Sequence, residues 1–180
     1  MRKSEELARR WMPGVRQGNL RPAWAHPQDL VNLLSEMKRD LSHQGQPFDQ
    51  IYDTLTDMAW AHDLLEDGRK SDGSKVTVGD LLTEGLAEEV VGGVVALSQK
   101  DGEDKVVYLA RLRFSSSLVM IVKCVDRICN LLEGRGIFED KRWYRYVQET
   151  TDYILPLTSD IAREEGNWLM ERLLHARDAR

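Results

Sequence analysis

Hydrophobic residues recur along almost the whole chain at the three- and four-residue spacings of amphipathic helices. No segment shows an equally strong alternation of apolar and polar residues, which a half-buried strand would need. Proline, glycine and polar turn residues separate the segments. The pattern predicts an all-α fold with helices over 4–11, 27–41, 48–65, two shorter segments with breaks near Gly85 and after Ser98, and then 104–114, 116–132, 140–155 and 157–175.

Length and charge limit the classes of protein that fit. A chain of 180 residues can bury a sizeable core and a pocket, and we expect one domain over 1–180. The net charge of −5 argues against a broad surface for nucleic acid or for anionic membranes. No run approaches the ~18 apolar residues of a membrane span. We therefore expect neither nucleic acid nor a membrane as a partner, whereas an anionic small molecule stays compatible with this charge, because a pocket can be locally basic.

The cysteines and the N-terminus indicate the compartment. The two cysteines, Cys124 and Cys129, are five positions apart, which places them on different faces of a helix. We expect them to be buried free thiols in a reducing environment. The segment MRKSEELARR has no apolar stretch of the kind found in signal peptides. These features predict a cytoplasmic protein.

The segment WAHDLLEDGRK (60–70) concentrates a histidine and several acidic residues beside apolar ones. On one continuous helix His62 and Glu66 share a face, and Asp63 and Asp67 pair in the same way. His62 and Asp63 can then both reach an ion in the groove between them. The alternative is a helix end whose acidic side chains are simply solvated. The apolar neighbours place the cluster at the rim of a core, which favours metal binding.

Two further positions extend this candidate site. Asp126 lies in the apolar stretch SSLVMIVKCVDRICNLL, where a buried carboxylate needs a cation or a proton. Asn130 follows four residues later and shares its helix face. His26 precedes Pro27 at a predicted helix start, a position that also suits a structural histidine. Imidazoles and carboxylates together suit a divalent transition metal, which activates water and neutralises phosphoryl charge.

The order of a histidine, a His-Asp pair and a later Asp resembles the signature of HD-domain metallohydrolases. One branch is similar in more detail, namely the hydrolase domain of the RelA/SpoT alarmone enzymes and the free-standing small alarmone hydrolases. AWAHP resembles its Y-x-x-H-P motif, AWAHDLLEDG its A-x-L-H-D-x-x-E-D motif, and VKCVDRICNL its K-x-A-D-R-x-x-N motif. The tail VQETTDYILPLTSDIAREEG resembles its E-T-x-x-x-Y-x-P-L motif. The resemblance spans about 23–166 and implies a single-domain, HD-type helical bundle.

The resemblance implies a role for each matching residue. In the family, a catalytic ion, usually Mn²⁺, is bound by the residues that match His26, His62, Asp63 and Asp126. The residues that match Glu66 and Asp67 position or activate the attacking water, and the one that matches Asn130 contacts the nucleotide. The implied reaction removes pyrophosphate from the 3′ position of ppGpp or pppGpp and leaves GDP or GTP. The implied partner is therefore the nucleotide (p)ppGpp.

The base-binding part of the resemblance is altered. Family members carry an arginine that stacks on guanine, in an R-K-x-G-x-P-Y segment before the first His-Pro. This chain has VRQGNLRPAW there, so only Arg16 or Arg21 is placed to substitute for it, with a shifted register. After Asn130 the family continues with a basic residue and threonine, whereas this chain has LLEG. Further candidate contacts to the substrate, each of which also fits an ordinary surface or packing role, are Lys100, Lys105, Arg111, Lys123 and Tyr153.

Two other functions remain compatible with the sequence. One is an HD-type nucleotide phosphatase that acts on 5′-monophosphates or on the 2′-phosphate of NADPH. Nucleotidases of this kind share the four ligands and a glutamate placed like Glu66, but they lack the Glu-Asp pair and the tail motif. The other is a non-catalytic module that senses a nucleotide through a retained site. The sequence leaves the metal's identity and homo-oligomer formation open.

Overall fold

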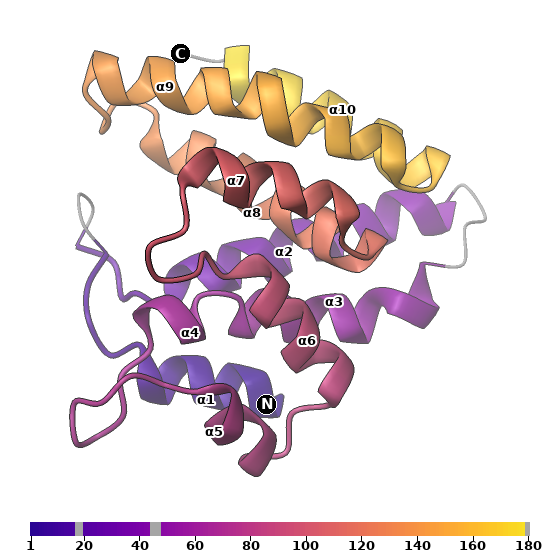
Figure 1. The fold of residues 1–180 in the computed structure, drawn as a ribbon. Coiled ribbons are helices and arrows are strands. Elements are labelled where there is room, and N and C mark those ends of the chain that lie inside the picture. The colour runs from indigo at the N-terminus through magenta and orange to yellow at the C-terminus, as the bar shows by residue number, and fades with distance from the viewer. Residues whose placement is uncertain (17–19, 44–47, 179–180) are drawn as a thin grey trace.

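Helices form every regular element that the structure describes. The computed structural model of the chain describes residues 1–16, 20–43 and 48–178 (Figure 1). Within these residues the extended backbone is limited to two isolated bridges, Val15–Pro22 and Arg69–Lys75. The α-helices are α1 (Lys3–Trp11), α2 (Ala25–His43), α3 (Asp49–Ala61), α4 (Leu64–Asp67), α5 (Val78–Thr83), α6 (Glu88–Leu97), α7 (Lys105–Arg111), α8 (Ser117–Gly134), α9 (Asp140–Glu149) and α10 (Arg163–Asp178). The prediction of an all-α fold is confirmed.

Three irregular helical segments complete the fold. They are the 3₁₀ turn η1 (Leu112–Phe114), the π turn η2 (Thr150–Ile154) and the 3₁₀ segment η3 (Leu155–Asp160). The predicted break near Gly85 is present, and Gly85 has a φ of 91°, a value that residues other than glycine rarely adopt. No helix formed by the described residues is long and apolar enough to cross a membrane.

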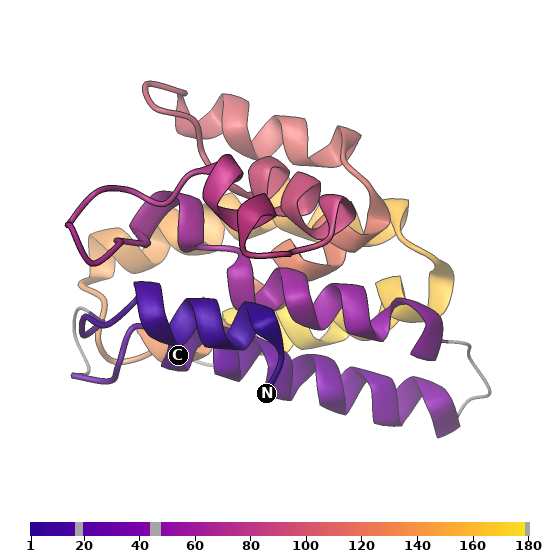
Figure 2. The same ribbon diagram turned by 90° about the horizontal axis from the view of Figure 1, so that it is seen from below.

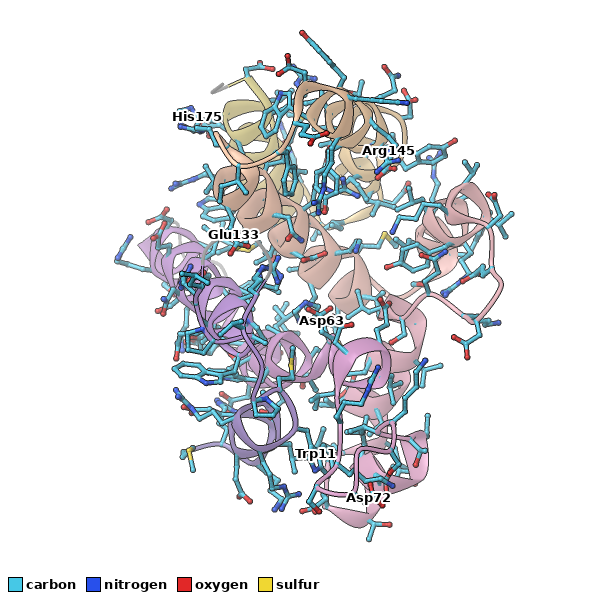
Figure 3. All side chains as sticks on the ribbon, turned by 90° about the vertical axis from the view of Figure 1, so that its left-hand side faces the viewer. Trp11, Asp63, Asp72, Glu133, Arg145 and His175 are labelled. Atoms are coloured by element: carbon cyan, nitrogen blue, oxygen red, sulfur yellow. The ribbon has the colours of Figure 1, made fainter. Side chains whose placement is uncertain are left out.

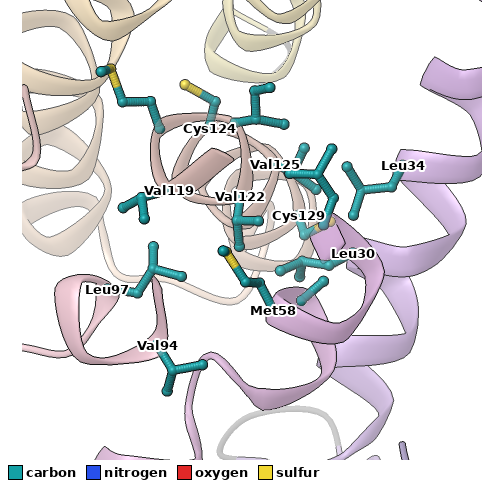
Figure 4. Close-up of a cluster of buried hydrophobic side chains, with 14 of the residues drawn as sticks. Leu30, Leu34, Met58, Val94, Leu97, Val119, Val122, Cys124, Val125 and Cys129 are labelled. Carbon is teal, nitrogen blue, oxygen red and sulfur yellow. The ribbon is translucent and has the colours of Figure 1, made fainter. Parts of the chain in front are cut away.

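Helix α8 forms the centre of the bundle. Its N-terminus is capped by Ser116, whose side chain accepts a hydrogen bond from the Val119 backbone N–H. Most of its residues are buried, because α2, α3, α6, η3 and α10 all pack against it. In Figure 4, Leu30 and Leu34 of α2, Met58 of α3, and Val94 and Leu97 of α6 surround the α8 side chains Val119, Val122, Cys124, Val125 and Cys129. Both cysteines are buried and free, as predicted.

The arrangement of α2 and α3 determines where the candidate site forms. Figure 2 shows the two helices side by side, with α1 along α3. They run in opposite directions, so the first turn of α2 and the last turn of α3 lie at the same end of the pair. Helices α9 and α10 lie on the opposite side of α8 from α1 (Figure 1). The start of α2, the end of α3 and the middle of α8 therefore come together.

The break after α3 differs from the predicted helix over 48–65. Helix α3 ends before His62, and His62 and Asp63 form a turn that leads into α4. Asp63 has φ −94° and ψ −2°, values typical of the third residue of a type I turn. The His62 side chain competes for a helix carbonyl, because its Nδ1–H bonds to the Ala59 oxygen. The prediction of one continuous helix was wrong, so the i to i+4 pairing of His62 with Glu66 does not apply.

The predicted helices over 140–155 and 157–175 also have different limits. Helix α9 ends earlier, the chain passes through η2 and η3, and α10 begins only at Arg163. Pro156 lies at the start of η3, where its missing N–H and its ring prevent an α-helix from continuing. The Thr150 hydroxyl donates a hydrogen bond to the Tyr146 carbonyl at the start of the π turn. The proline and this side-chain bond account for the irregular stretch.

Candidate metal centre

Three helical segments bring predicted ligands together. His26 lies in the first turn of α2, His62 follows the last residue of α3, and Asp126 is in the middle of α8. All three side chains are buried, and one ligand atom from each lies within 4.8 Å of the others. These residues are separated by up to a hundred positions in the chain, so only the tertiary fold can assemble them. The cluster could hold a metal ion.

The His62 ring is oriented by its own helix. Its Nδ1–H donates a hydrogen bond of 2.8 Å to the Ala59 carbonyl oxygen, because a carbonyl can only accept. The other ring nitrogen, Nε2, lies 3.0 Å from Asp63 Oδ1 and 3.9 Å from Asp126 Oδ1. This Nε2 is buried, and although the Asp63 oxygen lies close to it, the two do not meet at a hydrogen-bonding angle. Metal-binding histidines are usually oriented in this way: the ring nitrogen that does not bind the metal, here Nδ1, donates a hydrogen bond to a carbonyl or carboxylate oxygen.

Asp126 connects the other groups of the centre. Its Oδ1 lies 2.9 Å from His26 Nε2 and accepts a hydrogen bond from the Asn130 amide. Its Oδ2 accepts a hydrogen bond of 2.8 Å from the Lys123 ammonium group. Burial works to raise the pKa of Asp126, but Lys123 and the two histidines hold it well below its usual range. Asp126 is therefore an anion inside the bundle, and Asn130 shares its face as predicted.

The charge distribution fits a divalent cation. Burial opposes a positive charge on His62, but Asp63 and Asp126 outweigh burial and raise the pKa of His62 to about 9. The same carboxylates that favour a proton on Nε2 favour a metal ion there. Two imidazoles combined with carboxylates are a ligand set that divalent transition metals such as Mn²⁺ accept. The donor types of His26, His62 and Asp126 and the position of Nε2 beside two carboxylates therefore fit a divalent ion.

Asp63 differs from the other three predicted ligands. Its side chain is 25% exposed and contacts His62, and its carboxylate does not belong to the group of atoms within 4.8 Å of one another. Asp63 lies between α8 and α4, and Glu133 is on the same face of the molecule (Figure 3). Asp63 therefore marks the side of the centre that opens to solvent.

Glu66 and Asp67 extend the acidic cluster along α4. Glu66 Oε1 accepts a hydrogen bond of 2.7 Å from the Gln99 backbone N–H, which ties α4 to the loop after α6. Burial is the main cause that raises the pKa of both carboxyls, and the charge of Asp63 adds to it. Asp67 and Asp63 line a cavity of about 520 Å³. Carboxyls with raised pKa values beside a cavity are suited to exchange protons with a bound molecule.

Arg16 links this cavity to α8. Its guanidinium donates a hydrogen bond to the Asn130 side chain and forms an ion pair of 2.6 Å with Glu133. Arg16 also borders a smaller hollow of about 130 Å³, which is lined by the rings of Phe138 and Tyr146. Residues 17–19 of the VRQGNLRPAW segment lie outside the described residues. Of the two predicted arginines, Arg16 is the one that contacts Asn130, whose amide in turn bonds to Asp126.

Arg21 and Arg111, two other candidate substrate contacts, are engaged in ion pairs. Arg21 pairs with Asp29 at 2.8 Å and borders a different hollow, between α2 and α8. Arg111 pairs with Glu103 at 2.7 Å and donates to two carbonyls at the end of α6. The Arg111 contacts fix the loop between α6 and α7. The structure does not gather these two arginines at the metal centre.

The remaining candidates are distributed over α7, α8 and their surroundings. Lys105 and Lys123 lie over the Tyr108 ring, at 4.9 and 5.4 Å from its centroid. Burial lowers the pKa of Lys105, and the charge of Lys123 lowers it further. Lys100 is exposed on the loop after α6, and Tyr153 is half-buried in η2, packed against the core. Only Lys123 touches a predicted ligand, through its bond to Asp126.

Two residues near the centre were not predicted. Glu133 binds Arg16, and its Oε2 lies 3.9 Å from His26 Nδ1. It follows Asp126 by seven residues, or two helical turns, so helix periodicity is a signal that points to it. Arg69 lines the same 520 Å³ cavity as Asp63 and Asp67. Its sequence position in a polar loop gives no indication of the direction in which its side chain points.

Two comparisons with known proteins gave no match. No protein-family model matches the chain, and no curated protein matches its sequence.

Proposed function

We propose that this protein is a metal-dependent phosphohydrolase of the HD type, which removes the 3′-pyrophosphate of (p)ppGpp and leaves GDP or GTP. One observation carries the proposal. The buried Nε2 of His62 faces the carboxylates of Asp63 and Asp126, while its Nδ1–H is held by a backbone carbonyl. A buried ring nitrogen that is oriented in this way towards two carboxylates is better explained as a metal ligand than as part of the packed core. The identity of the nucleotide rests on the resemblance of the motifs.

Four side chains would hold the ion, which we expect to be Mn²⁺: His26, His62, Asp63 and Asp126. When bound, the ion supplies a positive charge that lowers the pKa of water and neutralises phosphoryl oxygens. The protein's own contribution is orientation. The Ala59 carbonyl fixes the His62 ring, and the Asn130 amide and the Lys123 ammonium each hold one oxygen of the Asp126 carboxylate.

Glu66 and Asp67 would carry the protons of the reaction. Hydrolysis breaks the bond between the 3′ oxygen and phosphorus, so water gives a hydroxyl to the pyrophosphate and a proton to the 3′ oxygen. One carboxylate is needed to accept the water's proton and one acid to donate to the leaving oxygen. Burial is the main cause that raises the pKa of both Glu66 and Asp67, and a carboxyl with a raised pKa keeps a proton to donate more readily. The Gln99 N–H holds the Glu66 carboxylate in place.

Cations near the candidate metal centre and around the cavity would bind the anionic nucleotide. Lys123 contacts Asp126, and Lys105 lies over the same Tyr108 ring as Lys123, so both would offset the negative charge of the pyrophosphate. Arg16 lines the cavity that contains Asp63 and Asp67. We therefore assign the contact with the nucleotide to Arg16 rather than Arg21.

A panel of nucleotides tests the proposal. Protein loaded with Mn²⁺ is incubated separately with ppGpp, with a set of 5′-monophosphates and with NADPH, and the products are separated by anion-exchange chromatography. We expect GDP from ppGpp and little product from the other compounds. Phosphate release from 5′-monophosphates or NADPH, with ppGpp intact, would show that the protein is a nucleotide phosphatase instead. Tight binding of ppGpp without hydrolysis, whichever divalent metal is added, would indicate a sensing module.

A further inference from the structure

The loop after α4 has a defined shape and packs against α1. The Arg69 N–H donates a hydrogen bond of 2.8 Å to the Trp11 carbonyl, and the loop closes on itself through the Arg69–Lys75 bridge. The Lys70 N–H donates to the Ser74 carbonyl at 2.9 Å. In Figure 3, Trp11 and Asp72 are labelled below Asp63, on the same face of the molecule. These bonds place Arg69 on the face where Asp63 opens to solvent.

Arg69 stands between two adjoining hollows. The first is the cavity of about 520 Å³ that Asp63 and Asp67 line. The second has a volume of about 550 Å³ and is lined by residues of α1, α5 and the loop, among them Lys70 and Asp80. Both hollows share Arg69 together with Trp11 and Pro13. A ligand that reaches from the acidic cluster into the second hollow would pass the Arg69 side chain.

Arg69 contributes a positive charge that no carboxylate of the described residues offsets through an ion pair. Its guanidinium donates hydrogen bonds to the carbonyls of Gly68 at 2.8 Å and Glu66 at 3.3 Å, and such bonds leave its charge in place. The other two cations of the second hollow are paired. Lys70 lies 3.1 Å from Asp80, and Arg10 binds Glu84. Arg69 is thus the cation of this hollow that remains available to an anion.

We infer that Arg69 binds a second phosphate group of the substrate, remote from the phosphate that reacts. This inference rests on the proposed function and assigns a residue to the phosphate-bearing position of the nucleotide that does not react. A guanidinium offers several N–H donors in one plane and binds phosphate oxygens through paired, charge-assisted hydrogen bonds. The acidic cluster and Arg69 line one cavity, so a single nucleotide can contact both. A nucleotide with one phosphate would contact only the acidic side.

Binding of inorganic pyrophosphate in EDTA tests the anion site without turnover. In EDTA the acidic cluster repels anions, so bound pyrophosphate reports on the cations around the hollows. We expect calorimetry to show binding by the wild type, and Arg69→Gln to weaken it roughly tenfold. Arg69→Lys keeps the charge and should retain part of the affinity. The control is Arg113→Gln, because Arg113 is exposed and pairs with Asp160 at 2.7 Å; its affinity should match the wild type. No binding by the wild type, or equal binding by Arg69→Gln, would overturn the inference.

Kinetics give a second, independent readout. For a nucleotide with phosphates at both the 3′ and 5′ positions, Arg69→Gln should raise KM roughly tenfold and change kcat little, because a ground-state contact is lost. For the corresponding nucleotide without a 5′-phosphate, the variant and the wild type should have the same KM. An equal rise for both compounds would contradict the inference. The pyrophosphate measurement needs no hydrolysis, so it tests the anion site even if the protein does not hydrolyse ppGpp. Conversely, hydrolysis of ppGpp with no effect of Arg69→Gln on pyrophosphate binding would reject the anion site and leave the proposed activity in place.

Discussion

At the scale of single residues, three buried polar side chains from distant parts of the chain meet inside the bundle and form the candidate metal centre. The burial of His26, His62 and Asp126 and their approach to one another agree with the motifs, because buried polar groups need partners and the fold supplies them from distant segments. The partners of charged surface residues could not be predicted in the same way. Arg111, for example, is held by Glu103 and by loop carbonyls, and these contacts depend on the path of one loop.

Asp126 should be essential for metal content. The Asp126→Ala variant removes a buried carboxylate that faces both histidines, so we expect it to purify with far less divalent metal than the wild type. Inductively coupled plasma mass spectrometry measures the metal per protein. Asp152→Ala serves as the control, because Asp152 is exposed and bonds only to Gln148 among the contacts found for it. Equal metal content in wild type and Asp126→Ala would show that Asp126 is not a ligand.

Glu66 and Asp67 should affect the rate and leave the metal in place. Glu66→Gln and Asp67→Asn keep the size of each side chain and remove its proton-accepting carboxylate. We expect unchanged metal content and a kcat that falls by ~10²–10⁴-fold if the group acts as general acid or base. Steady-state kinetics on the metal-loaded variants measure this. Near wild-type rates in both variants would mean that the two carboxylates are structural.

At the scale of elements, periodicity predicted which segments are helical, and side-chain chemistry decided where they end. The apolar spacing continues through His62 and Asp63, so the pattern extends α3 past its true end. The interruption comes from a side-chain bond to the Ala59 carbonyl and from the turn conformation of Asp63, neither of which a hydrophobic pattern encodes. Pro156 is the exception, because its effect on a helix is readable from sequence.

Two glycines in helices should respond oppositely to alanine. A Cβ at Gly166 of α10 would lie 2.2 Å from the Thr158 carbonyl oxygen, so backbone must move, and we expect Gly166→Ala to lose about 1–3 kcal/mol of stability. A Cβ at Gly92 of α6 meets nothing within 4 Å. Because alanine favours helix, Gly92→Ala should gain roughly 0.5–1 kcal/mol. Urea denaturation measures both. A stabilised Gly166→Ala variant would contradict the close approach of α10 to η3.

At the scale of the whole molecule, the central helix α8 joins the candidate metal centre to the core. The same helix that carries Asp126 also packs against α2, α3, α6 and α10. Arg127 on its other side is buried, stacks on the Tyr146 ring and pairs with Glu149 at 3.4 Å. A metal ion bound by residues of α2, the α3–α4 turn and α8 would therefore connect helices that also pack together in the core.

Metal binding should stabilise the whole fold. An ion that binds only the folded state adds RT ln(1 + [L]/Kd), about 2.7 kcal/mol at a free concentration of one hundred times Kd. For a domain of this size we expect Tm to rise by roughly 5–10 °C on addition of Mn²⁺ to EDTA-treated protein. Differential scanning calorimetry measures the shift, and His62→Ala should abolish it. A shift of equal size in His62→Ala would place the stabilising ion elsewhere.

The reaction with ppGpp itself, followed by ³¹P NMR on the Mn²⁺-loaded wild type and on Asp126→Ala, tests whether this protein is a 3′-pyrophosphohydrolase. The wild type should convert ppGpp to equal amounts of GDP and pyrophosphate, with the 5′-diphosphate intact, and Asp126→Ala should leave ppGpp unchanged. Release of single phosphate groups, or an unchanged ppGpp spectrum with metal-loaded wild type, would contradict the assignment of this protein as a 3′-pyrophosphohydrolase.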